Sequence, residues 1–159
     1  MLTTLLILAA LFIAARLAVP RLSSSVAEGP LERDGVRRLA DCPASPNCQG
    51  SDSGREAQRV EPFPMRGSAE ETITALAALI ERQDRAAIVT RAPDYLHATF
   101  TTALMGYTDD VEFLADEPSG TVRVRSASRL GKSDLGANAK RLAALRTAWS
   151  ATAAPAGNS

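Results

Sequence analysis

Regular alternation of apolar and polar side chains between residues 86 and 126 most narrows the possible folds. Residues 95–102, 111–116 and 121–126 alternate, and a short apolar run covers 86–91. A strand places successive side chains on opposite faces, so each stretch predicts a strand with one apolar face. A further short strand is expected near 58–63, where Pro62 and Pro64 confine it to an edge of the sheet. The pattern therefore predicts an antiparallel sheet of four to five strands.

The loop Glu117-Pro118-Ser119-Gly120 joins the last two expected strands and helps to fix their register. Gly120 suits the left-handed conformation that such a loop requires. The favourable register has three facing pairs: Asp116 with Thr121, Phe113 with Val124, and Glu112 with Arg125. A slip of one residue would move the apolar side chains of one strand to the opposite face, so this register is predicted.

Two helices flank the expected strands. Ser68 and Glu71 form a capping box, and apolar residues then recur at helical spacing to about Gln83. A second helix is expected after Asp134, which is a good N-cap. Its expected core residues are Leu135, Leu142, Leu145 and Trp149. Because each strand has one apolar face, an α+β fold with both helices on one side of the sheet is predicted.

Residues 1–19 are apolar apart from two threonines and Arg16. As a helix they would be roughly 28 Å long, close to the hydrocarbon thickness of a bilayer. A retained membrane anchor is preferred over a cleaved secretory signal, although Ser25-Val26-Ala27 offers a small-x-small cleavage pattern before Glu28. A buried soluble helix is the third interpretation.

The chain is expected to divide into four parts: a membrane anchor over 1–19, a polar linker over 20–40, an α+β domain over 41–150 and a flexible tail over 151–159. Arg16 and Arg21 follow the apolar run, which favours a cytoplasmic domain. Cys42 and Cys48 could instead form a disulfide of the kind that persists in oxidising compartments, or be two unrelated thiols. The exported, periplasmic side is preferred.

Several short motifs occur together between residues 42 and 145. They are Cys42-Pro43, Ser45-Pro46-Asn47-Cys48, Asp94-Tyr95, Asp109-Asp110-Val111-Glu112-Phe113, Arg125-Ser126-Ala127-Ser128-Arg129, Gly131, Ser133-Asp134-Leu135-Gly136, Asn138 and Arg141. Together they resemble the bacterial and plastid family of domain of unknown function 1499. The chain departs from that pattern at Gln49-Gly50, where an apolar residue and a serine would be expected. The resemblance implies no activity, substrate or catalytic residue.

Charge is segregated along the expected sheet and second helix. Residues 93–120 hold six acids, whereas residues 121–150 hold seven bases and one acid. One interpretation is that paired strands neutralise each other, as Glu112 opposite Arg125 would. The other is an anion pocket at the turn before the second helix, because exposed N–H groups at a helix start attract anions and arginines bind them bidentately. The expected anion-binding residues are Arg125, Arg129, Lys132, Ser133, Asn138 and Arg141.

Other site chemistries fit less well. Gly131-Lys132-Ser133 is not a P-loop, because Ser126 stands where that motif needs glycine. Asp109 and Asp110 are neighbours in a strand and should point to opposite faces, which disfavours a metal site. His97 is expected on the outward face as a solvated or hydrogen-bonded residue. No catalytic residue, metal or cofactor is therefore predicted.

Composition removes two further classes of protein. Eighteen basic and eighteen acidic residues cancel, so a general affinity for nucleic acid is not expected. Two cysteines and one histidine cannot supply a four-ligand zinc site of Cys and His. The preferred function is a non-catalytic, membrane-anchored module that binds an anionic small molecule or lipid head group. An envelope structural or assembly factor is the alternative, and an enzyme is the third.

Overall fold

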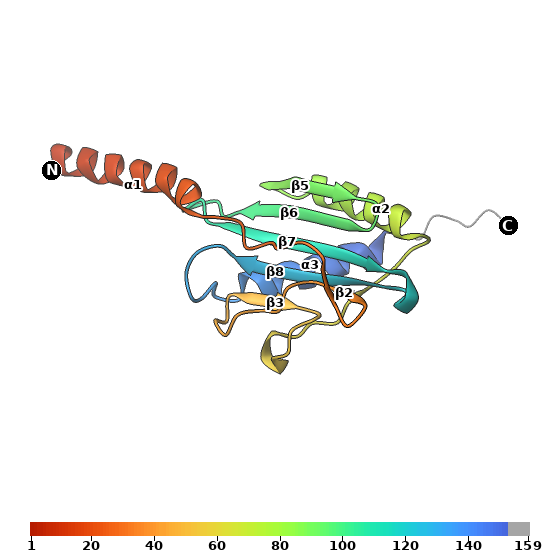
Figure 1. The fold of residues 1–159 in the computed structure, drawn as a ribbon. Helices are drawn as coiled ribbons and strands as arrows, with labels where there is room; N and C mark the ends of the chain where they lie inside the picture. The colour runs from red at the N-terminus through yellow and green to blue at the C-terminus, as the bar shows by residue number, and fades with distance from the viewer. Residues whose placement is uncertain (153–159) are drawn as a thin grey trace.

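The computed structural model describes residues 1–152, apart from the side chains of residues 19–22. It is an α+β fold (Figure 1). The main sheet has six strands: β3 (Cys48–Gly50), β4 (Phe63–Pro64), β5 (Ala86–Ala92), β6 (Tyr95–Thr101), β7 (Thr108–Asp116) and β8 (Thr121–Ser128). Their order is β3-β8-β7-β6-β5, with β4 also pairing with β8, and all these pairs are antiparallel.

The sheet has more strands than the four to five expected. The additional strand β3 has three residues, too few to show an alternating pattern in the sequence. The edge strand expected near 58–63 is the two-residue β4 at Phe63–Pro64, preceded by a 3-10 turn at Glu56–Gln58. The expected tail over 151–159 lies, from residue 153 on, outside the described residues.

Helices α2 (Ala69–Glu81) and α3 (Ala137–Ala151) cover one face of the sheet, as predicted (Figure 1). Both helices contribute buried side chains to the same core as the strands. Its members include Ile73, Leu76, Leu96, Val111, Phe113, Val124, Leu142, Leu145 and Trp149. This core is the apolar face that the alternation in the sequence predicts.

The register of β7 and β8 is the predicted one. Phe113 faces Val124, and Glu112 faces Arg125. The strands are joined by a 3-10 turn at Glu117–Ser119, after which Gly120 adopts a left-handed conformation with φ +64°. This register keeps Phe113 in the core, where a slip of one residue would expose it.

The helix starts agree with the sequence in one case and not in the other. Ser68 and Glu71 form the predicted capping box of α2. Helix α3 begins later than expected, at Ala137, with Gly136 as its N-cap. Asp134 still accepts the N–H groups of Gly136 and Asn138, at 2.9 and 2.8 Å, but Leu135 lies before the helix and is 89% exposed. The expectation that Leu135 is a core residue is wrong.

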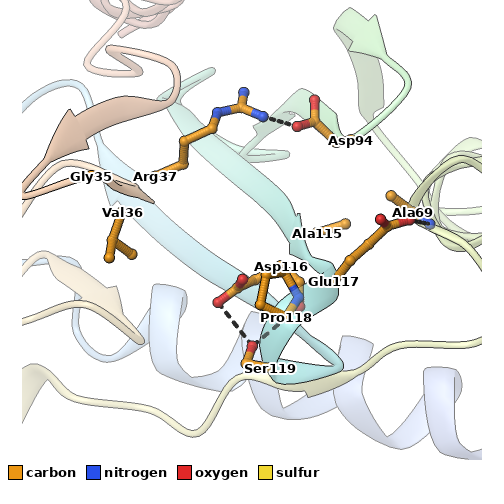
Figure 2. Close-up of a pocket in the computed structure, with 10 residues that line it drawn as sticks. All are labelled: Gly35, Val36, Arg37, Ala69, Asp94, Ala115, Asp116, Glu117, Pro118 and Ser119. Atoms are coloured by element: carbon orange, nitrogen blue, oxygen red, sulfur yellow. Dashed lines mark hydrogen bonds and ion pairs between the residues drawn. The ribbon is translucent and has the colours of Figure 1, made fainter.

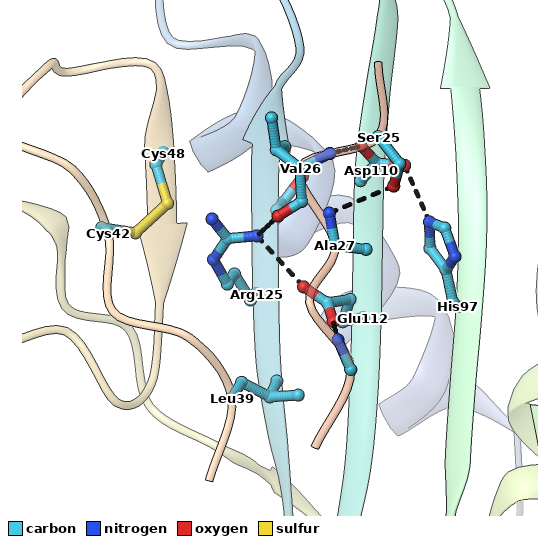
Figure 3. A network of polar contacts seen from close by, with 12 residues as sticks. Ser25, Val26, Ala27, Leu39, Cys42, Cys48, His97, Asp110, Glu112 and Arg125 are labelled. Atoms are coloured by element: carbon cyan, nitrogen blue, oxygen red, sulfur yellow. Dashed lines mark hydrogen bonds and ion pairs between the residues drawn. A yellow bond between two sulfur atoms is a disulfide. The ribbon is translucent and has the colours of Figure 1, made fainter. Parts of the chain in front are cut away.

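The N-terminal part of the chain covers the second face of the sheet. After helix α1 (Leu2–Leu22), residues 23–30 run across β7 and β8 on the side opposite α2 and α3, and we call them the strap (Figures 1 and 3). A short hairpin of β1 (Leu31–Arg33) and β2 (Val36–Arg38) follows. Residues expected to be a linker therefore make specific contacts with the sheet.

Helix α1 extends away from the sheet (Figure 1). Within the described part of the chain, no helix combines the length and the apolar character of a candidate membrane span. Anchoring through residues 1–19 stays a prediction.

Candidate functional site

Three carboxylates of β7 meet three arginines from the following segments. Arg125 lies in β8, Arg129 directly follows it, and Arg141 lies in α3. The three ion pairs are Arg125 Nη1 to Glu112 Oε2 at 3.0 Å, Arg129 Nη2 to Asp110 Oδ1 at 2.8 Å, and Arg141 Nη2 to Asp109 Oδ2 at 2.6 Å. Each of the expected anion-binding arginines therefore already faces an acidic partner.

The alternation of β7 divides these pairs between the two faces. Asp110 and Glu112 point to the strap side, whereas Asp109 reaches Arg141 on the helix side. The prediction that Asp109 and Asp110 face opposite ways is confirmed. The strap side is here called the polar face, and its charged or hydrogen-bonding members are Tyr95, His97, Asp110, Glu112, Arg125 and Arg129.

Asp110 is the most heavily bonded residue of the polar face. It is fully buried and accepts two hydrogen bonds from Arg129 and one from the backbone N–H of Val26, at 2.8 Å. His97 Nε2 lies 2.7 Å from its Oδ1. Burial alone would raise the pKa of Asp110, but the hydrogen bonds from His97, Arg129 and Val26 outweigh it, so the pKa lies well below its usual range. Asp110 is therefore a buried, ionised acceptor.

Glu112 forms the second centre of the polar face. The Tyr95 hydroxyl donates to its Oε1 at 2.8 Å, and the backbone N–H of Gly29 donates to the same atom at 3.1 Å. Burial and the negative charge of Glu112 raise the pKa of Tyr95 far above its usual value, so this hydroxyl remains a donor.

The strap contacts these side chains through its backbone (Figure 3). The N–H groups of Val26 and Gly29 reach Asp110 and Glu112, and the Val26 carbonyl accepts from Arg125 Nη1 at 2.9 Å. The Nε of Arg125 is buried and has no hydrogen-bond partner within residues 1–152. The polar face thus binds the backbone of the strap, and the Nε–H of Arg125 is a buried donor that these contacts leave unused.

Of the two alternatives predicted for His97, the hydrogen-bonded one is found, with Asp110 as its partner, whereas the face on which it lies is not solvated. It is only 6% exposed because the strap covers the face to which it points. Tyr95, Val26 and Gly29 were not predicted as members of a site. Tyr95 and His97 alternate with apolar residues opposite an acidic strand, which was a usable sign of a polar network, whereas nothing in the sequence marks the backbone contacts of Val26 and Gly29.

The remaining predicted anion-binding residues lie elsewhere. Asn138 is a buried centre on the helix side, and its Oδ1 accepts from Ser126 at 2.5 Å and from Arg141 at 2.6 Å. Its Nδ2 donates to the Asn47 carbonyl, to Ser128 and to Asp134. Because Arg125 and Arg129 lie on the opposite face, the six residues do not converge on one pocket.

Lys132 and Ser133 are exposed in the loop before α3. The start of that helix is occupied by Asp134, which already accepts the N–H of Asn138. Because the three arginines are paired with carboxylates, the described residues do not form a cluster of unpaired positive charges at the loop before α3. Anion binding by the six-residue set stays a prediction.

Cys42 and Cys48 form the disulfide that was one of the two alternatives, with their Cα atoms 5.6 Å apart. The pair packs with Ala127 of β8 and against Val26 of the strap. The bridge thus fixes the loop that lies beside the polar face (Figure 3).

A separate cavity of about 610 Å³ lies between the β1–β2 hairpin, the start of α2 and the β7–β8 turn (Figure 2). Its acidic side chains have partners in the protein. Asp94 pairs with Arg37, Asp116 pairs with Arg123 at 2.7 Å, and Glu117 accepts the N–H of Ala69 at 3.0 Å. No charged group of this lining is left free for a ligand among the described residues, so the polar face is the stronger candidate site.

The fold and site define an α+β domain with a six-stranded antiparallel sheet, two helices on one face and a buried polar network on the other. A family model described as Protein of unknown function (DUF1499) matches residues 38–149, and the chain belongs to this family. The resemblance seen in the sequence is thereby confirmed. Comparisons with curated proteins and with solved structures gave no match.

Proposed function

We propose that the domain is a non-catalytic binding module and that the polar face is its ligand site, which the strap fills in the ligand-free protein. One observation carries this proposal. Asp110, Glu112 and Arg125 are almost completely buried, yet their contacts with the strap involve only backbone N–H and C=O groups. Another molecule that presents the same groups in the same order can replace the strap.

The contacts of the strap define the chemistry of this ligand. An oxygen that replaces the Val26 carbonyl meets Arg125, which favours a carboxylate, phosphate or other anionic group. Groups that replace the two strap N–H groups meet Asp110 and Glu112, which favours an amine or hydroxyl donor. The ligand we propose is an anionic small molecule or lipid head group with a neighbouring donor, as in phosphoethanolamine.

The surroundings of His97 support binding in preference to catalysis. His97 and Asp110 resemble two members of a catalytic triad, but Ser126 and Ser128 bond to Asn138 on the helix side of the sheet. A histidine needs a nucleophile within hydrogen-bond reach to act as its base. We therefore assign His97 the role of a hydrogen-bond partner that helps to keep the buried carboxylate of Asp110 ionised.

Membrane attachment on the exported side is the second part of the proposal. Leu5, Leu6, Leu8 and Leu11 of α1 are each 60–61% exposed, which is unfavourable in water and favourable in lipid. The disulfide of Cys42 and Cys48 suits an oxidising compartment.

Competition between strap and ligand gives a test of the site. Gly29→Ala weakens docking of the strap, because Gly29 has φ +76°, a conformation that alanine adopts only at a cost. Ser24→Ala is the matched control in the same segment, because Ser24 is exposed and has no hydrogen bond or ion pair within residues 1–152. The melting temperature of the full chain in detergent is measured with and without phosphoethanolamine.

Phosphoethanolamine should stabilise Gly29→Ala more than the wild type, since the apparent Kd falls as the strap-free fraction rises. Ser24→Ala should match the wild type. If neither this probe nor inorganic phosphate nor ethanolamine shifts any variant, the binding proposal is wrong and an envelope structural role becomes the better account.

A further inference from the structure

One end of the sheet combines exposed apolar side chains with the attachment of helix α1. The β6–β7 loop (102–107) and the β8–α3 loop (129–136) both lie at this end (Figure 1). The backbone N–H of Arg129 donates to the Thr108 carbonyl, which joins the bases of the two loops. Arg16 near the end of α1 donates to the carbonyls of Ala103 and Leu104, both at 2.6 Å. These hydrogen bonds place the exposed apolar helix directly beside the β6–β7 loop.

The tips of the two loops carry apolar side chains that the core does not use. Leu104 is 70% exposed, Leu135 is 89% exposed and Tyr107 is 43% exposed. We call these three residues the apolar tips. Leu135 also has φ +53°, a left-handed conformation that is unfavourable for a non-glycine residue. Neither this exposure nor this backbone conformation contributes to packing of the domain.

The charged residue beside the apolar tips, Lys132, favours contact with an anionic surface. Lys132 is exposed in the same loop as Leu135 and forms no ion pair within residues 1–152. The acid nearest to it in sequence, Asp134, is used by the backbone N–H groups of Gly136 and Asn138. Basic residues near a bilayer surface are attracted to anionic lipid head groups.

We propose that this end of the domain docks on a phospholipid bilayer, with Leu104 and Leu135 inserted among the lipids, Tyr107 at the head-group level and Lys132 facing lipid phosphates. Tyrosine is enriched at this level of the interface because its ring is apolar and its hydroxyl is polar. The inference rests on the proposed membrane attachment through α1 and adds the orientation of the domain to it. The polar face would then stand beside the membrane surface, where a lipid head group could reach it.

Tryptophan reporters in the full chain test this orientation. Three variants are reconstituted into vesicles of phosphatidylcholine and phosphatidylglycerol with brominated acyl chains, which quench tryptophan within the bilayer. Leu135→Trp reports on the apolar tips, Leu8→Trp reports on α1, and Val89→Trp is the control. Val89 is 54% exposed on β5 at the edge of the sheet. The signal of Trp149, which is buried, is subtracted by measuring the wild type.

We expect loss of fluorescence at positions 135 and 8 but not at position 89. Lys132→Glu in the Leu135→Trp background should reduce quenching in vesicles with phosphatidylglycerol. Quenching at position 8 without quenching at 135 would overturn the docking proposal and leave membrane attachment intact. Absence of quenching at both would overturn attachment as well. A blue shift at 135 without quenching would assign the apolar tips to a protein contact instead, and would also overturn the proposal.

Discussion

Arg129 and Asp110 are joined by two hydrogen bonds, from Nε to Oδ2 at 3.0 Å and from Nη2 to Oδ1 at 2.8 Å. This two-point contact uses the planar guanidinium against a fully buried carboxylate. An arginine expected to hold a free anion therefore holds an acidic side chain of the protein. The same is true of Arg125 with Glu112 and of Arg141 with Asp109.

We predict that Arg129→Ala destabilises the ligand-free protein by about 3–5 kcal/mol, because Asp110 would lose its main cationic partner while still buried. Lys132→Ala is the control and should change stability by less than about 0.5 kcal/mol, as expected for an exposed residue. Urea unfolding of both variants measures the difference. A stability of Arg129→Ala close to the wild type would show that the arginine is free to serve a ligand.

The low pKa of Asp110 predicts a pH-dependent contribution to stability. Its pKa is below the value of about 3.9 found in an unfolded chain, so the folded protein binds fewer protons. The stabilisation is complete above that unfolded value and is lost as the pH falls through it toward the folded pKa. The destabilisation caused by Asp110→Asn should therefore be larger at about pH 5 than at about pH 3. Equal free-energy differences at both values would contradict the assignment.

Asn138 should behave as a structural residue. Its amide group accepts from Ser126 and Arg141 and donates to Ser128, Asp134 and the Asn47 carbonyl, and the side chain is fully buried. Asn138→Ala leaves several of these groups without hydrogen-bond partners. Each such group that water cannot reach lowers the free energy of unfolding by about 1–3 kcal/mol. Thermal unfolding without any ligand should show a large loss of stability, whereas an unchanged melting temperature would favour a role in binding.

The disulfide provides a fourth test of stability. It closes a short loop, for which the chain-entropy estimate is about 2 kcal/mol. A reductant should lower the free energy of unfolding of the wild type by about this amount. The double variant Cys42→Ser and Cys48→Ser should resemble the reduced wild type and not respond to the reductant. Equal stability of oxidised and reduced wild type would contradict the structural role.

The elements with repeated local signals could be predicted from the sequence. The alternation in β6, β7 and β8, the capping box of α2 and the pairing of Phe113 with Val124 follow from side-chain periodicity and turn chemistry. Such signals are local in the chain, and the burial of one face adds a strong constraint on register.

The polar face could not be predicted in the same way. Its acidic and basic members were visible, and the pairing of Glu112 with Arg125 was one of the two interpretations. That the strap covers this face could not be predicted, because its contacts with Asp110 and Glu112 use the backbone N–H groups of Val26 and Gly29. Backbone groups are common to nearly all residues and leave no mark in a sequence. Residues 23–30 are also polar and rich in serine, a composition typical of a linker. His97 was therefore expected on an outward face, whereas the strap side on which it lies is buried.

Hydrogen exchange at the backbone N–H groups of Val26 and Gly29 tests the central claim most directly, since these groups donate to Asp110 and Glu112 when the strap is docked. In the ligand-free protein both amides should exchange slowly. Saturating phosphoethanolamine should accelerate their exchange, because the ligand displaces the strap, while the amides of β7 remain protected. Binding of the probe with unchanged or slower exchange at Val26 and Gly29 would place the ligand elsewhere and contradict the account.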